Sequence, residues 1–247
     1  MLRIYAVEYL NTLPFIKGLK FLSQQDAVEI IQSTPSKCAE ALRDHKADIA
    51  LIPVGSLSDF EKIHLISDFC IGCDGAVKSV CLFTNKHWGQ IKTIQLDPAS
   101  RTSNLLLQLL VKEYWKRDDI SYWEINNVDE EPDAKLIIGD DSFQAHDTYL
   151  YSYDLGYFWK KYTGLPFVFA VWASRTENHK KLNEAFNEAF AKGISDTITN
   201  VPKYKDLNEE EVRTYFDTNI SYPFDNLKRT ALNLFLNKTG IKTDWLT

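Results

Sequence analysis

Residues 48–53 of the chain read DIALIP, a short segment in which almost every side chain is apolar. A strand with one face in water alternates apolar and polar residues, and this segment has almost no polar face. The pattern therefore indicates a strand that is buried on both sides. Such strands are typical of a mainly parallel sheet that is covered by helices.

Two earlier segments also have the composition of buried strands, and a helix follows each of them. LRIYAV at 2–7 leads into helical spacing over 11–21, and residues 28–32 lead into a helix that opens at 33–36. Strands that alternate with helices in this way are typical of an α/β fold. The sequence therefore predicts that the N-terminal third forms an α/β lobe.

The rest of the chain divides into a strand-rich part and a helical end. Strand-like runs lie at 63–69, 77–83 and 94–96, a helix is expected over 103–114, and FVFAVWA at 167–173 is one long apolar strand. After this strand, helical spacing is found at 179–194, 209–215 and 225–239. We therefore expect an α/β protein with a C-terminal helical segment.

No flexible Gly/Ser-rich linker separates the parts, so we expect the chain to pass between lobes along strands. The long apolar runs near Phe83 and Ala173 are the expected crossings. Lobe one is then 1–83 plus 174–247, and lobe two is 84–173. This discontinuous pattern is similar to the two-lobed architecture of type II periplasmic-binding proteins, with the active site in the cleft between the lobes. Fold alone does not define function.

Composition excludes several classes of function. The chain has 247 residues and a net charge of −6, and it lacks a run of basic residues, so a nucleic-acid partner is not expected. The N-terminal segment lacks the roughly 7–15 apolar residues of a signal peptide, because Glu8, Asn11 and Pro14 interrupt it. The whole chain also lacks a run of about 18 apolar residues, so we expect no membrane-spanning helix. We expect a cytoplasmic protein that does not bind membranes; the sequence indicates no oligomeric state.

The cysteines and histidines do not form a convincing metal site. Cys70 and Cys73 make one CxxC pair, but a structural zinc needs two further ligands, and nearby Cys81 lies in an apolar run. Small buried apolar residues are the better interpretation of these cysteines. The five histidines are scattered without ligand spacing, and the chain has no dinucleotide or P-loop fingerprint. We therefore predict no metal.

Several polar residues stand beside predicted strands, where ligands bind in open α/β sheets. Asn11 closely follows the first strand, and Ser79 stands at the start of another. Gly139 and Asp140 end the strand LII at 136–138. Each has a structural alternative: Asn11 suits a helix N-cap, Ser79 a plain β-turn, and Asp140 a cap of the next helix.

The segment LDPASRTS at 96–103 ends a strand and opens a helix, which makes it a candidate anion site. A helix N-terminus offers free N–H groups and a partial positive charge. Ser100, Thr102 and Ser103 add hydroxyl donors, and Arg101 adds a guanidinium. A carboxylate suits this site at least as well as a phosphate, because no P-loop lysine follows. The structural alternative is an ordinary Ser/Thr cap.

Taken together, the segments resemble the chorismate dehydratase family of the futalosine route to menaquinone. The matching stretches are YLNTLP at 9–14, ADIALIPV at 47–54, GAVKSV at 75–80, LDPASRTS at 96–103, LIIGDDS at 136–142 and DLGYFWKKYTGLPFVFAVW at 154–172. The last stretch is the most specific because of its length. The C-terminal helices carry little signature.

The resemblance implies an enzyme that removes water from the dicarboxylate chorismate and forms 3-[(1-carboxyvinyl)oxy]benzoate. Aromatisation drives this step, so we expect no cofactor. By resemblance, Asn11 and Ser79 touch the reacting ring. Neither is a strong base, so a carboxylate of the substrate itself is the expected proton acceptor.

The same resemblance implies which residues bind the substrate. Thr102, Ser103 and Arg101 would hold one carboxylate. The substrate-binding set is completed by Ser100, Gly139 and Asp140.

Two other functions stay open at this point. The related 1,4-dihydroxy-6-naphthoate synthase family shares the fold and the Asp-Leu-Gly…Trp…Thr-Gly segment, but it carries a His-Glu pair where this chain has Gly139 and Asp140. The second alternative is a non-catalytic solute-binding protein with the same fold. The missing leader sequence disfavours it, because such proteins usually work outside the cytosol.

Overall fold

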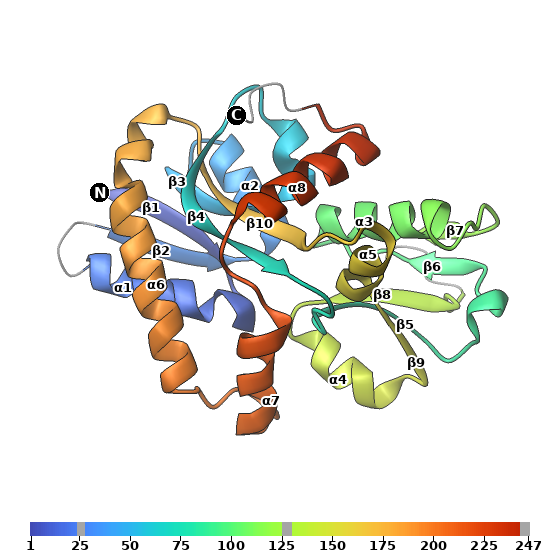
Figure 1. The fold of residues 1–247 in the computed structure, drawn as a ribbon. Helices are drawn as coiled ribbons and strands as arrows, with labels where there is room; N and C mark the ends of the chain where they lie inside the picture. Colours follow the sequence, from blue (N-terminus) through green and yellow to red (C-terminus); the bar gives the residue numbers. More distant parts are fainter. Residues whose placement is uncertain (24–27, 125–129, 243–247) are drawn as a thin grey trace.

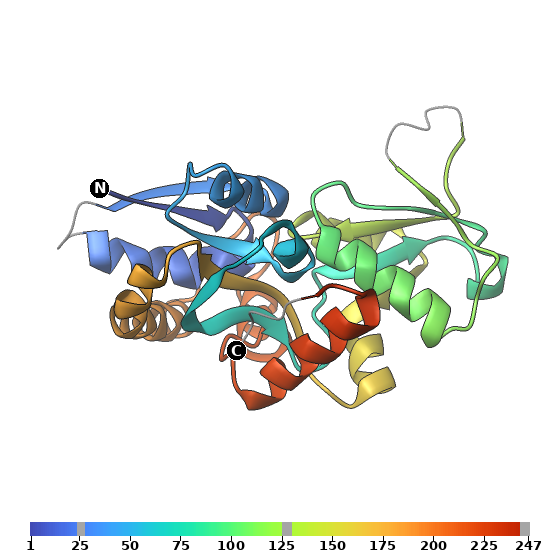
Figure 2. The same ribbon diagram turned by 90° about the horizontal axis from the view of Figure 1, so that it is seen from above.

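The computed structural model describes residues 1–23, 28–124 and 130–242, which form two lobes lying side by side (Figures 1 and 2). Each lobe contains one five-stranded sheet with helices packed against it. The predicted α/β class and the two-lobed arrangement are confirmed.

The order of elements follows the sequence predictions closely. The strands are β1 Leu2–Val7, β2 Val28–Ser33, β3 Ile49–Pro53, β4 His64–Cys73, β5 Val80–Thr84, β6 Thr93–Gln95, β7 Ser121–Trp123, β8 Ala134–Ile138, β9 Tyr151–Asp154 and β10 Phe167–Ser174. The α-helices are α1 Leu13–Ser23, α2 Pro35–Arg43, α3 Arg101–Glu113, α4 Asp141–Thr148, α5 Leu155–Thr163, α6 Asn183–Thr199, α7 Glu209–Thr214 and α8 Asn226–Thr239. Short 3₁₀ turns are η1 Leu10–Thr12, η2 Val54–Asp59, η3 Trp88–Gln90 and η4 Glu177–Leu182, and η5 Tyr215–Asn219 is a π-helix.

The sheet of lobe one has the order β2-β1-β3-β10-β4. Strand β1 runs parallel to β2 and β3, and β10 runs antiparallel to β3 and β4. The sheet is therefore mixed, and the mainly parallel sheet expected from the DIALIP segment is only half of it. All five residues of β3 are buried, which explains why this strand has no polar face.

The sheet of lobe two has the order β7-β6-β8-β5-β9. The change of sheet therefore lies between β4 and β5, at 74–79, and again between α5 and β10, at 164–166. The expected boundaries after residues 83 and 173 do not coincide with it: β5 belongs to the second sheet, and β10 belongs to the first. Both strands are buried along their whole length, so their composition does not indicate which sheet they join.

The helical C-terminal segment returns to lobe one, where α6 packs side by side with α1 (Figure 1). The two helices approach closely at Gly18 and Gly193. A Cβ atom at Gly193 would overlap the carbonyl oxygen of Pro14 and lie 2.6 Å from the backbone nitrogen of Gly18. This close approach requires glycine, and it fixes α6, the first helix of the C-terminal segment, against α1.

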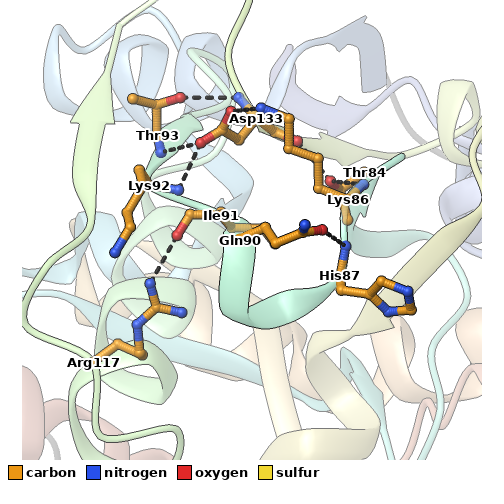
Figure 3. Close-up of polar contacts among 9 residues, drawn as sticks. All are labelled: Thr84, Lys86, His87, Gln90, Ile91, Lys92, Thr93, Arg117 and Asp133. Atoms are coloured by element: carbon orange, nitrogen blue, oxygen red, sulfur yellow. Dashed lines mark hydrogen bonds and ion pairs between the residues drawn. The ribbon is translucent and has the colours of Figure 1, made fainter.

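In lobe two, Asp133 joins three neighbouring strands of the sheet at one end of these strands (Figure 3). Its carboxylate accepts hydrogen bonds from the backbone nitrogens of Lys92 at 2.6 Å and Thr93 at 3.1 Å. Its backbone oxygen accepts a 2.6 Å bond from the Thr84 hydroxyl, and Lys86 forms an ion pair with its side chain. The starts of β6 and β8 and the end of β5 are thereby fixed to one another.

None of the helices in the described ranges is both long enough and apolar enough to span a lipid bilayer.

Candidate active site

A cavity of about 50 Å³ lies between the lobes, and both lobes line it. Lobe one contributes Tyr9, Asn11 and Phe169, whereas lobe two contributes Ser103 and Gly139. Ser79, on the crossing between β4 and β5, also lines this cavity. Polar groups that are distant in sequence therefore meet in one small, largely apolar pocket between the lobes.

Asn11 lies within the 3₁₀ turn that connects β1 to α1, and the residue at the N-cap position of this turn is Tyr9. Its side-chain oxygen accepts a 3.1 Å hydrogen bond from the Thr12 hydroxyl, and its backbone oxygen accepts a 2.9 Å bond from the Tyr222 hydroxyl. The residue is 8% exposed. The N-cap interpretation is thus not supported, and the amide is held at the cavity wall.

Ser79 is fully buried at the end of the crossing that leads into β5. Its Oγ atom accepts a 2.8 Å hydrogen bond from the Tyr215 hydroxyl, while its own contact to the Val77 oxygen is 3.5 Å long. Its backbone oxygen accepts a 2.8 Å bond from the nitrogen of Gly139. Ser79 is therefore held at its hydroxyl by Tyr215 and at its backbone by Gly139, and its hydroxyl proton makes only a long contact.

The crossing before Ser79 is shaped by the carboxylate of Asp154. This side chain accepts bonds from the backbone nitrogens of Val77 at 3.1 Å and Lys78 at 2.7 Å, and it caps α5 through Tyr157. Lys78 has a φ of 61°, in the left-handed region. Burial raises the pKa of Asp154, and the backbone N–H groups around it oppose that rise. The DLG segment thus supports the turn that presents Ser79.

Ser100 and Ser103 stand at the N-terminus of α3, and both line the cavity. Ser100 caps the helix by accepting a 3.1 Å bond from the Ser103 nitrogen, and its hydroxyl donates to the Ser103 hydroxyl at 2.8 Å. The structural interpretation as a cap therefore holds for Ser100. In this arrangement the Ser100 hydroxyl proton is used by Ser103, so the Ser103 hydroxyl and the helix N-terminus are the groups available to an anion in the cavity.

Thr102 and Arg101, predicted to bind a carboxylate, point elsewhere. The Thr102 hydroxyl accepts a 2.9 Å bond from the Gly55 nitrogen and donates to the Phe169 oxygen at 3.3 Å. The guanidinium of Arg101 is half-exposed and forms a 2.5 Å ion pair with Asp59. Neither residue lines the cavity, because successive helical residues point in different directions, and both bridge α3 to lobe one.

Gly139 lines the cavity, and Asp140 does not. Gly139 has a φ of 64°, and a Cβ atom there would lie 2.8 Å from the ring of Tyr9. The Asp140 carboxylate accepts a 3.0 Å bond from the Leu10 nitrogen and a bond from the Tyr204 hydroxyl, and it makes no capping bond to α4. Asp140 therefore connects the two lobes.

Sequence reasoning missed three tyrosines around the site: Tyr9, Tyr215 and Tyr222. Tyr9 is the first residue of the YLNTLP stretch and could have been included on that ground. Tyr215 and Tyr222 come from the C-terminal segment, where the sequence carries no local signal for a site. They do not line the cavity, but they bond to Ser79 and Asn11, which do.

The side chains that line the cavity carry no charge. Burial, with Asp97 and Asp140 nearby, raises the pKa of Tyr9, so its phenol stays protonated at neutral pH. Among the described residues, no three His, Cys, Asp or Glu side chains are grouped as a metal ion would need. Burial raises the pKa of Cys70 to about 12, which disfavours a thiolate. The site therefore offers hydroxyl, amide and backbone groups.

A family model described as menaquinone biosynthesis matches residues 2–240, almost the entire chain. The chain belongs to this family. The family resemblance predicted from the sequence is thereby confirmed.

Two proteins with sequences similar to this chain are chorismate dehydratases. The enzyme of Campylobacter jejuni is 28% identical over 238 residues, which cover 93% of this chain and 94% of that protein. The enzyme of Thermus thermophilus is 25% identical over 272 residues, which cover 94% of this chain and 93% of that protein.

Solved structures agree on the fold. Protein AF1704 from Archaeoglobus fulgidus has a TM-score of 0.76 at 16% identity, covering 96% of each chain. The Candida albicans CA3427 gene product, described as having the periplasmic binding protein fold, has a TM-score of 0.65 at 14% identity, covering 100% of this chain and 92% of its own. The predicted periplasmic-binding-protein-like fold is confirmed.

Proposed function

We propose that this protein is a chorismate dehydratase, a hydro-lyase that converts chorismate to 3-[(1-carboxyvinyl)oxy]benzoate in the futalosine route to menaquinone. The observation that carries the proposal is the meeting of Asn11, Ser79 and the Ser100–Ser103 pair in one interlobe cavity. The names of the two curated relatives support the same substrate. The cytoplasmic location expected from the sequence belongs to this proposal.

The reaction needs few groups from the protein. The C–H bond at the ether-bearing ring carbon breaks, and its electron pair forms the new ring double bond. The neighbouring C–O bond breaks at the same time, and hydroxide leaves. The released proton and the hydroxide together make one water. Because the product ring is aromatic, the proposed step needs neither a redox cofactor nor a metal.

The uncharged cavity wall favours a carboxylate of the substrate as the proton acceptor. A carboxylate without a cation beside it, in a largely apolar space, has a raised pKa and is a stronger base. A well-oriented group within the same molecule can reach effective molarities on the order of 10⁵ M or more. In this proposal Asn11 and Ser79 orient the ring and stabilise the leaving hydroxyl, while Ser100 and Ser103 hold a carboxylate.

Substrate entry would require the lobes to separate. The cavity volume of about 50 Å³ is far below the roughly 300 Å³ or more of small-molecule pockets. The contacts Arg101–Asp59 and Leu10–Asp140 join the lobes outside the cavity. Closure after binding would exclude water and fix the geometry of the reacting groups.

The kinetic test removes each proposed catalytic group. We expect Asn11→Ala and Ser79→Ala each to lower kcat with chorismate by about 10²-fold or more, because each removes a polar contact to the reacting groups. Ser152→Ala is the matched control, since Ser152 is exposed on β9 and outside the cavity. Folded Asn11→Ala and Ser79→Ala enzymes with normal turnover would contradict the assignment. Stabilisation by chorismate without product would instead favour a binding protein.

A further inference from the structure

Tyr215 is a buried polar residue in the C-terminal segment, a part of the chain that carries little family signature. It is 2% exposed and begins the π-helical segment η5 directly after α7. Its ring packs edge-on against Phe143 of lobe two, with ring centroids 5.0 Å apart. Single π-helical turns are rare and frequently occur at functional sites.

The Tyr215 hydroxyl determines how the Ser79 hydroxyl can bond. A serine hydroxyl has one proton to donate and accepts through its lone pairs. Tyr215 donates to Ser79 Oγ at 2.8 Å, so the serine acts as acceptor in this bond. Among the described residues, the other side-chain bond of Ser79 is its 3.5 Å contact to the Val77 oxygen, at the outer limit for a hydrogen bond. The Ser79 proton is thus available to a group in the cavity.

Burial also fixes the protonation state of this tyrosine. Burial raises the pKa of Tyr215, and hydrogen bonds with Ser79 and Asn11 oppose the rise. The phenol therefore stays protonated and can keep donating. Tyr215 bonds to Ser79, and Tyr222 of the same segment bonds to the backbone of Asn11.

Neighbouring residues hold the segment in place on both sides. Asn219, at the end of η5, donates to the backbone oxygen of Ala76 at 3.0 Å, on the crossing that presents Ser79. Tyr222 donates to the backbone oxygen of Asn11 at 2.9 Å. Segment 215–222 therefore contacts both the crossing that presents Ser79 and the turn that holds Asn11.

We propose that Tyr215 is a positioning residue that orients the Ser79 hydroxyl so that its proton points at the oxygen leaving the substrate. This inference rests on the proposed dehydratase function. Tyr215 and Ser79 exchange no proton with the substrate: the ring proton goes to the substrate carboxylate, and the Ser79 O–H stabilises the departing hydroxide by a hydrogen bond. Water then forms from that hydroxide and the abstracted proton.

A double-mutant cycle tests this inference. The enzymes are wild type, Tyr215→Phe, Ser79→Ala and the double variant, each with folding checked by circular dichroism, and kcat and KM are measured with chorismate. We expect Tyr215→Phe to lower kcat roughly 10- to 100-fold with little change in KM, because a misplaced hydroxyl lowers turnover more than binding. In the Ser79→Ala background the same change should have no further effect. Tyr162→Phe is the control, since it removes a bonded hydroxyl from α5, outside the cavity.

Three results would overturn the inference, and they are distinguishable. Folded wild-type protein without turnover overturns the proposed function, and the inference falls with it. An active wild type with an unchanged Tyr215→Phe kcat overturns the inference alone. Equal losses in the wild-type and Ser79→Ala backgrounds also overturn it, because Tyr215 would then not act through Ser79. Tyr215→Met, which also lacks the hydroxyl, replaces the phenylalanine variant if that one does not fold.

Discussion

Neighbouring residues at the start of α3 make different kinds of contact. Ser100 and Ser103 line the cavity, whereas Arg101 and Thr102 contact lobe one. Side chains at successive helical positions point about 100° apart, so one run of polar residues can serve both a ligand and an interface. Here the hydroxyl of Thr102 is fully used by the protein and has no free role in binding.

This division makes a prediction about stability. Thr102→Val keeps the shape of the side chain but removes the acceptor of the Gly55 N–H and the donor to the Phe169 oxygen. Leaving these buried groups unpaired should lower the free energy of unfolding by about 1–3 kcal/mol, measured by urea denaturation. Thr230→Val makes the same change at an exposed position of α8 and should have little effect. Equal stability of the Thr102→Val protein and wild type would contradict this role.

At the residue scale, the sequence was informative where polar residues stand beside strand ends. Asn11, Ser79, Ser100, Ser103 and Gly139 all line the cavity. Arg101, Thr102 and Asp140 do not, and this was not predictable, because their partners are distant in sequence: Asp59, Gly55 and Leu10. A local sequence pattern shows which side chains are polar. It does not show which of them will form bonds to the other lobe.

At the scale of elements, the contact between α1 and α6 brings the C-terminal segment back to the first lobe. Gly18 and Gly193 allow this contact, since backbone of one helix lies against backbone of the other. The path of the chain beyond α6, and hence the positions of Tyr215 and Tyr222, depends on it. Helical spacing predicted that these helices exist, but spacing does not indicate which lobe a helix covers.

The glycine contact leads to a prediction for α6. Alanine favours a helix by about 1 kcal/mol over glycine, but a methyl group at Gly193 would overlap the Pro14 carbonyl. We expect Gly193→Ala to lower the free energy of unfolding by about 1–3 kcal/mol net. Gly89→Ala is the control, because a Cβ at that exposed position meets no atom within 4 Å. A Gly193→Ala protein more stable than wild type would mean that α1 and α6 do not pack this closely.

At the scale of the whole molecule, the two sheets are connected by two crossings, and the cavity lies between the lobes they join. Buried strands such as β3 predicted the fold class well. The exact crossings were not predictable, since β5 and β10 are apolar throughout and would suit either sheet. The lobes are bridged around the cavity by Arg101–Asp59, by Asp140 and by Tyr215–Ser79. These contacts hold the lobes together beside the cavity.

The most direct test of the central claim is to incubate the purified, folded protein with chorismate, without added metal or nucleotide, and to analyse the mixture by mass spectrometry. The proposed dehydratase predicts that chorismate loses one water and becomes 3-[(1-carboxyvinyl)oxy]benzoate. Chorismate that stays unchanged in the presence of folded protein would contradict it.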